Sequence, residues 1–115
     1  IIKDAYNANP SSMKLSIESF YKMHGSNKVL VLGDMLELGE FAEFEHRQII
    51  DMTKTLGFQN SIFVGENFMK VKDMFHGKYF KHIDEAREYF KNNNFTQALI
   101  LLKGSRGISV EKIIL

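Results

Sequence analysis

Three short polar segments contain most of the residues in this 115-residue chain that could do chemistry. The first contains an acid, an aromatic ring and two amides: Asp4, Tyr6, Asn7 and Asn9. It lies between an apolar strand start and the Asn9-Pro10 pair, which is typical of the beginning of a helix. Open α/β sheets bind ligands just beyond the carboxyl ends of their strands. The position and the residue types therefore predict a loop that contacts a ligand.

The other two segments each follow an apolar run that is typical of a buried strand. The second covers residues 33–40 and includes the acids Asp34 and Glu37. The third covers residues 103–107 and supplies Lys103, Ser105 and Arg106 between two glycines. Glycines let the main chain approach an anionic ligand closely. Together the three segments predict one rim that carries carboxylates, amides, a hydroxyl and two cations.

Each of these features also has an ordinary structural interpretation. Asn9 can serve only as a helix cap, and Asp4 can cap or solvate its own loop. Asp34 and Glu37 can be plain polar loop residues, and residues 103–107 can form a simple turn. His46 lies at the border of the apolar face of a predicted helix, where packing at the helix edge is a more common role than catalysis.

Short apolar runs alternate with stretches of helical period along the chain. The runs predict strands at residues 1–2, 29–32, 62–64, 79–80 and 98–102. Helices are predicted from Pro10 to near Gly25, over residues 41–56 and 67–75, after a cap at Asp84, and over residues 110–115. This order predicts a Rossmann-like three-layer α/β/α domain with a mainly parallel sheet of five or six strands.

Composition and missing motifs exclude several classes of protein. Fifteen basic and fourteen acidic residues give a net charge of +1, without the basic excess of a nucleic-acid-binding domain. The absence of Cys excludes disulfides and thiolate metal sites, and the four His are too widely spaced for a His-based metal site. No apolar stretch is long enough to span a membrane, and the chain start lacks the layout of a signal peptide. The GxxxxGK[ST], GxGxxG and GxSxG motifs are also absent.

The three polar segments, in this order and at this spacing, resemble the C-terminal domain of the Mur ligases. The matching segments are residues 4–13 (DAYNANPSSM), residues 31–39 (VLGDMLELG) with His46 after them, and residues 102–107 (LKGSRG) with Glu111 after them. The resemblance covers essentially all of residues 1–115. Two of the segments, YNANP and GDMxELG, are specific to the member that adds a D-Ala-D-Ala dipeptide. One departure is Lys3, where the family commonly has a second acid.

The resemblance implies a cytoplasmic, ATP-dependent ligase of three domains. This chain would be its C-terminal domain, cut from a longer protein and inactive alone. ATP would phosphorylate the carboxylate of UDP-N-acetylmuramoyl-tripeptide, and the amine of D-Ala-D-Ala would then attack the acyl phosphate during peptidoglycan precursor synthesis. The absent central domain would supply most of the contacts to ATP and Mg²⁺, and this domain would dock on it and close over the nucleotide.

The resemblance also implies roles for the nucleotide-facing residues. Asp4 matches the acid that reaches the ribose hydroxyls. Tyr6, Asn7 and Asn9 match the segment that lies against adenine and ribose, where ring stacking and amide hydrogen bonds suit a purine.

A second group of residues is implied to meet the incoming dipeptide. Lys103, Ser105 and Arg106 lie where the family binds it, and Arg can bind its carboxylate through two parallel hydrogen bonds. Asp34 and Glu37 are expected either to orient the dipeptide ammonium or to steady their own loop.

Three alternatives remain open at this point. One is the C-terminal domain of another Mur-type amide ligase, and one is a domain that only packs against a neighbour. The third is a response-regulator receiver domain, which shares the length, the five βα units and a Lys at the end of the fifth strand. A receiver needs a phosphorylatable Asp after its third strand, where this chain has Val64-Gly65-Glu66.

Overall fold

A computed structural model describes residues 2–3, 8–95 and 97–114 of the chain. Its strands are β1 (Ile2–Lys3), β2 (Lys28–Gly33), β3 (Asn60–Val64), β4 (Lys78–Phe80) and β5 (Leu99–Lys103). Its α-helices are α1 (Pro10–Lys22), α2 (Ala42–Thr55), α3 (Glu66–Lys70) and α4 (Ile83–Asn92). Short 3-10 turns are η1 (Gly39–Phe41), η2 (Lys72–Met74), η3 (Arg106–Ile108) and η4 (Val110–Ile114). The predicted alternation of strands and helices is confirmed.

The five strands form one parallel sheet in the order β1-β5-β2-β3-β4. The chain therefore steps in one direction across the sheet from β1 to β4, and β5 then returns to the centre, between β1 and β2. Because crossovers between parallel strands are right-handed, this change of direction requires the helix before β5 to lie on the opposite face from the earlier helices.

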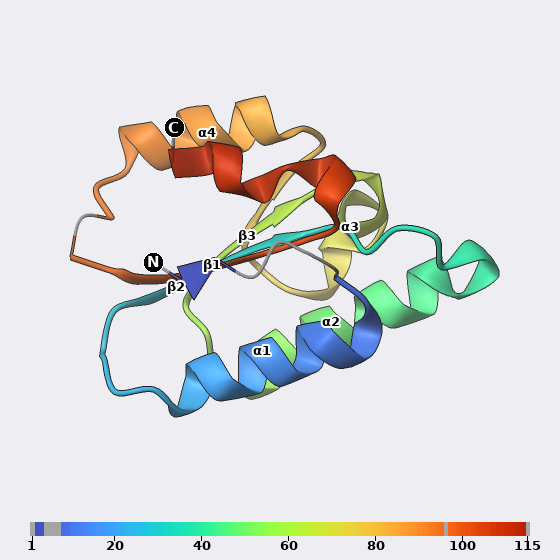
Figure 1. The fold of residues 1–115 in the computed structure, drawn as a ribbon, viewed down its shortest axis with the longest axis horizontal. Helices are drawn as coiled ribbons and strands as arrows, with labels where there is room; N and C mark the ends of the chain where they lie inside the picture. Colours follow the sequence, from blue (N-terminus) through green and yellow to red (C-terminus); the bar gives the residue numbers. More distant parts are fainter. Residues whose placement is uncertain (1, 4–7, 96, 115) are drawn as a thin grey trace.

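Helices cover both faces of the sheet, as Figure 1 shows with α1 and α2 below it and α4 with η4 above it. Successive residues of a strand point to opposite faces. Accordingly, Leu30 and Leu32 of β2 join the cluster under α1 and α2, whereas Val29 and Val31 join the cluster under α4 and η4. The predicted Rossmann-like three-layer architecture is confirmed.

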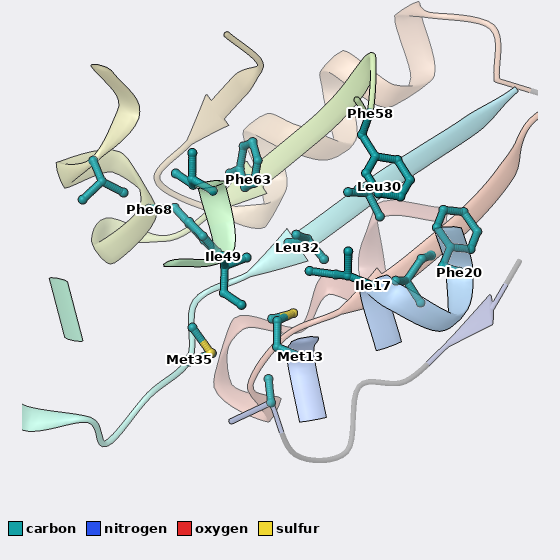
Figure 2. Close-up of a cluster of buried hydrophobic side chains, with 14 residues drawn as sticks. Met13, Ile17, Phe20, Leu30, Leu32, Met35, Ile49, Phe58, Phe63 and Phe68 are labelled. Carbon is teal, nitrogen blue, oxygen red and sulfur yellow. The ribbon is translucent and has the colours of Figure 1, made fainter. Parts of the chain in front are cut away.

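The larger core lies between the sheet and α1 and α2 (Figure 2). Met13, Ile17 and Phe20 recur at helical spacing on α1, are buried and face Leu30 and Leu32. Burial of each such side chain contributes about 1.5–3 kcal/mol relative to exposure. The apolar stripe of α1 therefore fixes this helix against the sheet and, with it, the segment that leads into the helix.

The start of α1 is capped as the sequence predicts. The side-chain oxygen of Asn9 accepts a hydrogen bond from the Ser12 N–H at 2.9 Å, and Ser12 Oγ accepts one from the Asn9 N–H at 3.2 Å. This reciprocal pair satisfies donors that a helix start leaves unpaired. The other end differs from the prediction, because α1 ends at Lys22 and Met23 is extended before Gly25 is reached.

Three further helix predictions need correction. Residues 67–75 do not form one helix, because Val71 leaves helical geometry (φ −116°, ψ 18°) and separates α3 from η2. Asp84 does not cap α4; His82 holds the cap position and Asp84 lies in the first turn, where the helix dipole favours an acid. The last predicted helix is instead the 3-10 turn η4, which begins at Val110, directly after Ser109 in a left-handed conformation.

Two close approaches at the carboxyl edge of the sheet require glycine. Gly65 has φ +128°, and a Cβ there would lie 2.2 Å from Asp34 Cγ. A Cβ on Gly104 would lie 2.8 Å from the Cα of Gly33, so the turns after β2 and β5 can touch only because both residues lack a side chain. The glycines at these strand ends thus allow close packing between the turns.

We expect Gly65→Ala to destabilise the chain by about 3 kcal/mol or more, because the new methyl group would displace Asp34. Gly57→Ala is the matched control, since Gly57 also has a positive φ (+78°) but has open space around it. Backbone strain alone should cost that variant about 1–2 kcal/mol. Urea unfolding of both variants measures the difference, and equal losses would show that the contact with Asp34 is unimportant.

Candidate functional site

A pocket of about 350 Å³ opens where the three polar segments meet. It is lined by Ala8, Asn9, Leu36, Glu37, Ser105, Arg106 and Gly107. These residues follow β1, β2 and β5, which are neighbours in the sheet. The chain leaves β1 and β2 toward one face and leaves β5 toward the other, and such reversal points are the usual ligand sites of parallel α/β sheets. The structure therefore brings together the second and third segments that the sequence singled out and the described end of the first, Ala8 and Asn9.

Ser105 joins the three segments through hydrogen bonds. Its N–H donates to the Asp34 carbonyl at 3.0 Å, and its Oγ accepts from the Leu36 N–H at 2.9 Å. The same hydroxyl donates to the Ala8 carbonyl at 3.4 Å. A single side chain thus connects the turns after β1, β2 and β5, so the pocket walls are held relative to one another.

The loop after β2 is fixed by three consecutive backbone N–H groups. The N–H of Asp34 donates to the Val64 carbonyl at 2.9 Å, and that of Met35 donates to His46 Nε2 at 3.0 Å. The Leu36 N–H donates to Ser105, as described above. Glu37 follows in a left-handed conformation with φ 63°, which is uncommon for a residue other than glycine. The hydrogen bonds of the preceding residues hold Glu37 at the pocket mouth in this uncommon backbone conformation.

Asp34 itself lies beneath the pocket, with only 3% of its surface exposed. Its carboxylate accepts hydrogen bonds from the N–H groups of Asn67 at 2.8 Å and Phe68 at 3.0 Å. The Asp34 carboxylate therefore caps the start of α3, because the residue at the N-cap position is Gly65, which provides no side-chain cap. The predicted contact of Asp34 with a substrate stays a prediction, whereas the observed contacts give it the alternative task, that of steadying the site.

His46 is completely buried, so its predicted place at a helix edge is wrong. Packing is part of its role, since its ring meets the Phe68 ring edge-on at 4.7 Å. Its two nitrogens are also used: Nε2 accepts from the Met35 N–H, and Nδ1 lies 2.6 Å from the Ala42 carbonyl. This pattern requires a neutral ring with its proton on Nδ1. Helical periodicity marked the position of His46 but contained no signal of its partner in the β2 loop.

Burial governs the protonation of the two central side chains. It lowers the pKa of His46, although the Ala42 carbonyl and the nearby Asp34 carboxylate oppose that shift. Burial also raises the pKa of Asp34, although the N–H groups of Asn67 and Phe68 oppose it. His46 Nε2 and Asp34 Oδ1 are 3.8 Å apart. The hydrogen bond that Nε2 accepts from the Met35 N–H also favours the neutral ring, so His46 is uncharged near neutral pH.

The remaining predicted residues fall into three groups. Glu37 and Arg106 are exposed and line the same pocket with opposite charges. Lys103 is only 1% exposed and lies in β5, below the pocket lining. The predicted nucleotide contacts Asp4, Tyr6 and Asn7 lie outside the described residues. The pocket as described is suited to a small ligand that carries both a cation and an anion, because each charge finds a partner there.

Neither a cluster of metal-ligand side chains nor a membrane-spanning helix is found in the described part of the chain. Within residues 2–3, 8–95 and 97–114, no three His, Asp or Glu side chains gather as metal ligands. Nor do these residues form a helix with the length and apolar character needed to cross a membrane.

A parallel sheet covered on both faces, with a charged pocket where its connections diverge, defines a Rossmann-like domain. The family described as "Mur ligase, glutamate ligase domain" matches residues 1–106. The chain belongs to this family. Membership leaves the receiver-domain interpretation without support.

Curated relatives carry the name UDP-N-acetylmuramoyl-tripeptide–D-alanyl-D-alanine ligase. The Bacillus subtilis protein is 36% identical over 123 residues, and the Rickettsia prowazekii protein is 31% identical over 118 residues. Each match covers 99% of this chain but only 27% and 26% of the relative. The chain thus spans about a quarter of the length of these relatives.

Two solved structures with the same fold carry the name MurF. A crystal structure of MurF from Acinetobacter baumannii gives a TM-score of 0.84 at 28% identity, over 96% of this chain and 26% of that one. MurF from Thermotoga maritima, in complex with ADP, gives a TM-score of 0.78 at 21% identity, over 96% of this chain and 26% of that one. The second likeness shows the fold alone.

The protonation of His46 predicts a pH-dependent stability. In the unfolded chain His46 titrates near its ordinary value of about 6.5, whereas its pKa in the folded chain is lower. Below pH 6.5 the unfolded chain therefore binds a proton that the folded chain does not, and stability falls as the pH falls. We expect the free energy of unfolding to drop more between pH 7.5 and 5.5 in the natural chain than in His46→Gln. Urea titrations at both pH values test this, and identical drops would contradict it.

Proposed function

We propose that this chain is the C-terminal domain of a cytoplasmic three-domain ligase that joins D-Ala-D-Ala to UDP-N-acetylmuramoyl-tripeptide in peptidoglycan precursor synthesis. Family membership and the names of the relatives support this proposal. The observation that carries it is the placement of Glu37 and Arg106 on one pocket of about 350 Å³. D-Ala-D-Ala is a zwitterion, with an ammonium at one end and a carboxylate at the other, and it needs one partner for each.

In the proposed reaction, the tripeptide carboxylate first takes the terminal phosphoryl group of ATP. This step gives an acyl phosphate and ADP. The dipeptide amine, once it has lost a proton, attacks the acyl carbon and expels phosphate, so that one amide bond forms. Holding the amine and the acyl group together accounts for much of the catalysis in reactions of this kind.

Within this domain, Arg106 would bind the dipeptide carboxylate and Glu37 would orient its ammonium. Two parallel hydrogen bonds between guanidinium and carboxylate fix the direction of the ligand as well as its position. Ser105 would act mainly by holding the walls together, since its hydroxyl already bonds to Leu36 and Ala8. Lys103, which was predicted to meet the dipeptide, would support the pocket from below. Asp34 would do the same, in line with the second of its two predicted roles, that of steadying its loop.

The nucleotide part of the proposal concerns Asp4, Tyr6, Asn7 and Asn9. Asn9 lines the pocket, and the atom of its side chain that takes part in the cap is the oxygen. The first polar segment would lie against the adenosine of ATP. The phosphates and Mg²⁺ would be bound mainly by the central domain, because this sequence has no GxxxxGK[ST] loop.

We expect Arg106→Ala and Glu37→Gln to raise the KM of the full-length ligase for D-Ala-D-Ala. Removing a charged hydrogen bond should cost about 1.5–3 kcal/mol in kcat/KM. Arg87→Ala on α4 is the control, because Arg87 lies on an element that contributes nothing to the pocket. Phosphate release with varied dipeptide measures the effect, and the 115-residue chain alone should release none. Unchanged kinetics in both pocket variants would refute the dipeptide role.

The proposed docking surface is the exposed aromatic pair Phe41 and Phe44, which we call the aromatic prong. These side chains are 62% and 59% exposed. Their spacing places them on one face of the helical segment formed by η1 and the start of α2. This segment projects from the carboxyl edge of the sheet, the edge that holds the pocket (Figure 1). We propose that it packs against the larger remainder of the ligase when the domain closes.

We expect the double change Phe41→Ser with Phe44→Ser to lower kcat/KM of the full-length ligase about tenfold or more, by loss of buried apolar area on closure. Leu15→Ser is the matched control, because Leu15 is equally exposed (66%) but lies on α1, away from the pocket. Steady-state kinetics and thermal unfolding should be measured together. A loss of activity that is the same for the control would argue against a specific docking surface.

A further inference from the structure

We propose that His46 is a positioning residue, which sets the Leu36–Glu37 wall of the pocket from its buried side and thereby tunes recognition of the ligand's cationic end. The identity of that ligand rests on the proposed function. The positioning itself rests on the contacts of His46 within the described chain.

The His46 ring is immobilised by three different contacts. Nδ1 lies 2.6 Å from the carbonyl of Ala42 on the same helix, which anchors the ring to α2. The Phe68 ring of α3 meets it edge-on, with an angle of 82° between the planes. Nε2 is therefore held at a fixed point and faces the loop after β2, where it accepts from the Met35 N–H at 3.0 Å.

Met35 lies between Asp34 and Leu36 in the loop after β2, two residues before Glu37. The residues on either side are held by Val64 and by Ser105. Without His46, the N–H of Met35 would be a buried donor without an acceptor, which is energetically unfavourable. The least costly relief is a rotation of the backbone at Met35, and such a rotation turns the residues that follow. The left-handed Glu37 is then no longer held at the pocket mouth.

The acidic groups around His46 favour a second proton on its ring, and the burial of the ring opposes them. Asp34 lies 3.8 Å away at the end of β2, Glu45 precedes His46 on α2, and Glu66 of α3 acts on Asp34. A second proton on Nε2 would face the Met35 N–H and end the hydrogen bond between them. The loop therefore keeps its geometry only while His46 is neutral.

Two substitutions separate the two nitrogens of the ring. The side-chain oxygen of Gln can reach the place of Nε2, whereas the shorter Asn reaches only the place of Nδ1. His46→Gln should therefore keep an acceptor for Met35, and His46→Asn should lose it. Thr53→Val controls for a general change in α2, because Thr53 is buried on the same helix and its hydroxyl bonds only within it.

We expect His46→Asn to speed amide hydrogen exchange at Met35 and Leu36 in this chain. In the full-length ligase it should raise the KM for D-Ala-D-Ala roughly tenfold, with kcat and the KM for ATP little changed. His46→Gln and Thr53→Val should stay close to the natural protein in both measurements. Rescue by Gln is the result that a role in packing alone does not predict.

Equal exchange at Met35 in the Asn and Gln variants would overturn the inference. Faster exchange with an unchanged dipeptide KM would overturn it too, provided that Arg106→Ala raises that KM. If Arg106→Ala also has no effect, the proposed function fails, and the exchange data alone decide the positioning role. Should His46→Asn not fold, the natural chain still gives a test by NMR. A scalar coupling across the hydrogen bond between the Met35 nitrogen and His46 Nε2 supports the inference, and its absence at neutral pH overturns it.

Discussion

The buried carboxylate of Asp34 is the contact on which the carboxyl edge of the sheet depends. It satisfies two N–H groups at the start of α3, while its backbone bonds to β3 on one side and to the turn after β5 on the other. Gly65 must lack a side chain to make room for it. A carboxylate buried this deeply is stable only with such partners, and α3 in turn has no local side-chain cap.

This arrangement separates the residues that hold the site from those that face a ligand. Asp34 and His46 are buried, and their side chains form hydrogen bonds with backbone groups. They can therefore fix a loop but cannot reach far into the pocket. Glu37 and Arg106 are exposed on the pocket wall. A rigid buried layer under an exposed charged layer lets long side chains keep a defined geometry without losing access to solvent and ligand.

The described domain supplies one side of the site proposed for it. Its pocket opens at the same edge as the aromatic prong, and both lie where a larger protein would have to meet it to enclose a ligand. The chain covers about a quarter of its relatives, which agrees with a domain that contributes binding groups. In the proposed ligase, the phosphate chemistry belongs to the remainder.

The sequence by itself determined the order of strands and helices, the three-layer fold and the meeting of three polar segments at one edge. These features follow from local periodicity and from the parallel direction of the strands, which brings every strand end to the same side. It also determined the Asn9 cap, because a cap involves only near neighbours. Only the tertiary structure decided that Asp34 turns inward and Glu37 outward, that Lys103 is buried, and that His46 serves the β2 loop. The partners of these side chains lie on other elements, such as Asn67 and Phe68 for Asp34, and no local pattern shows which groups will face one another after folding.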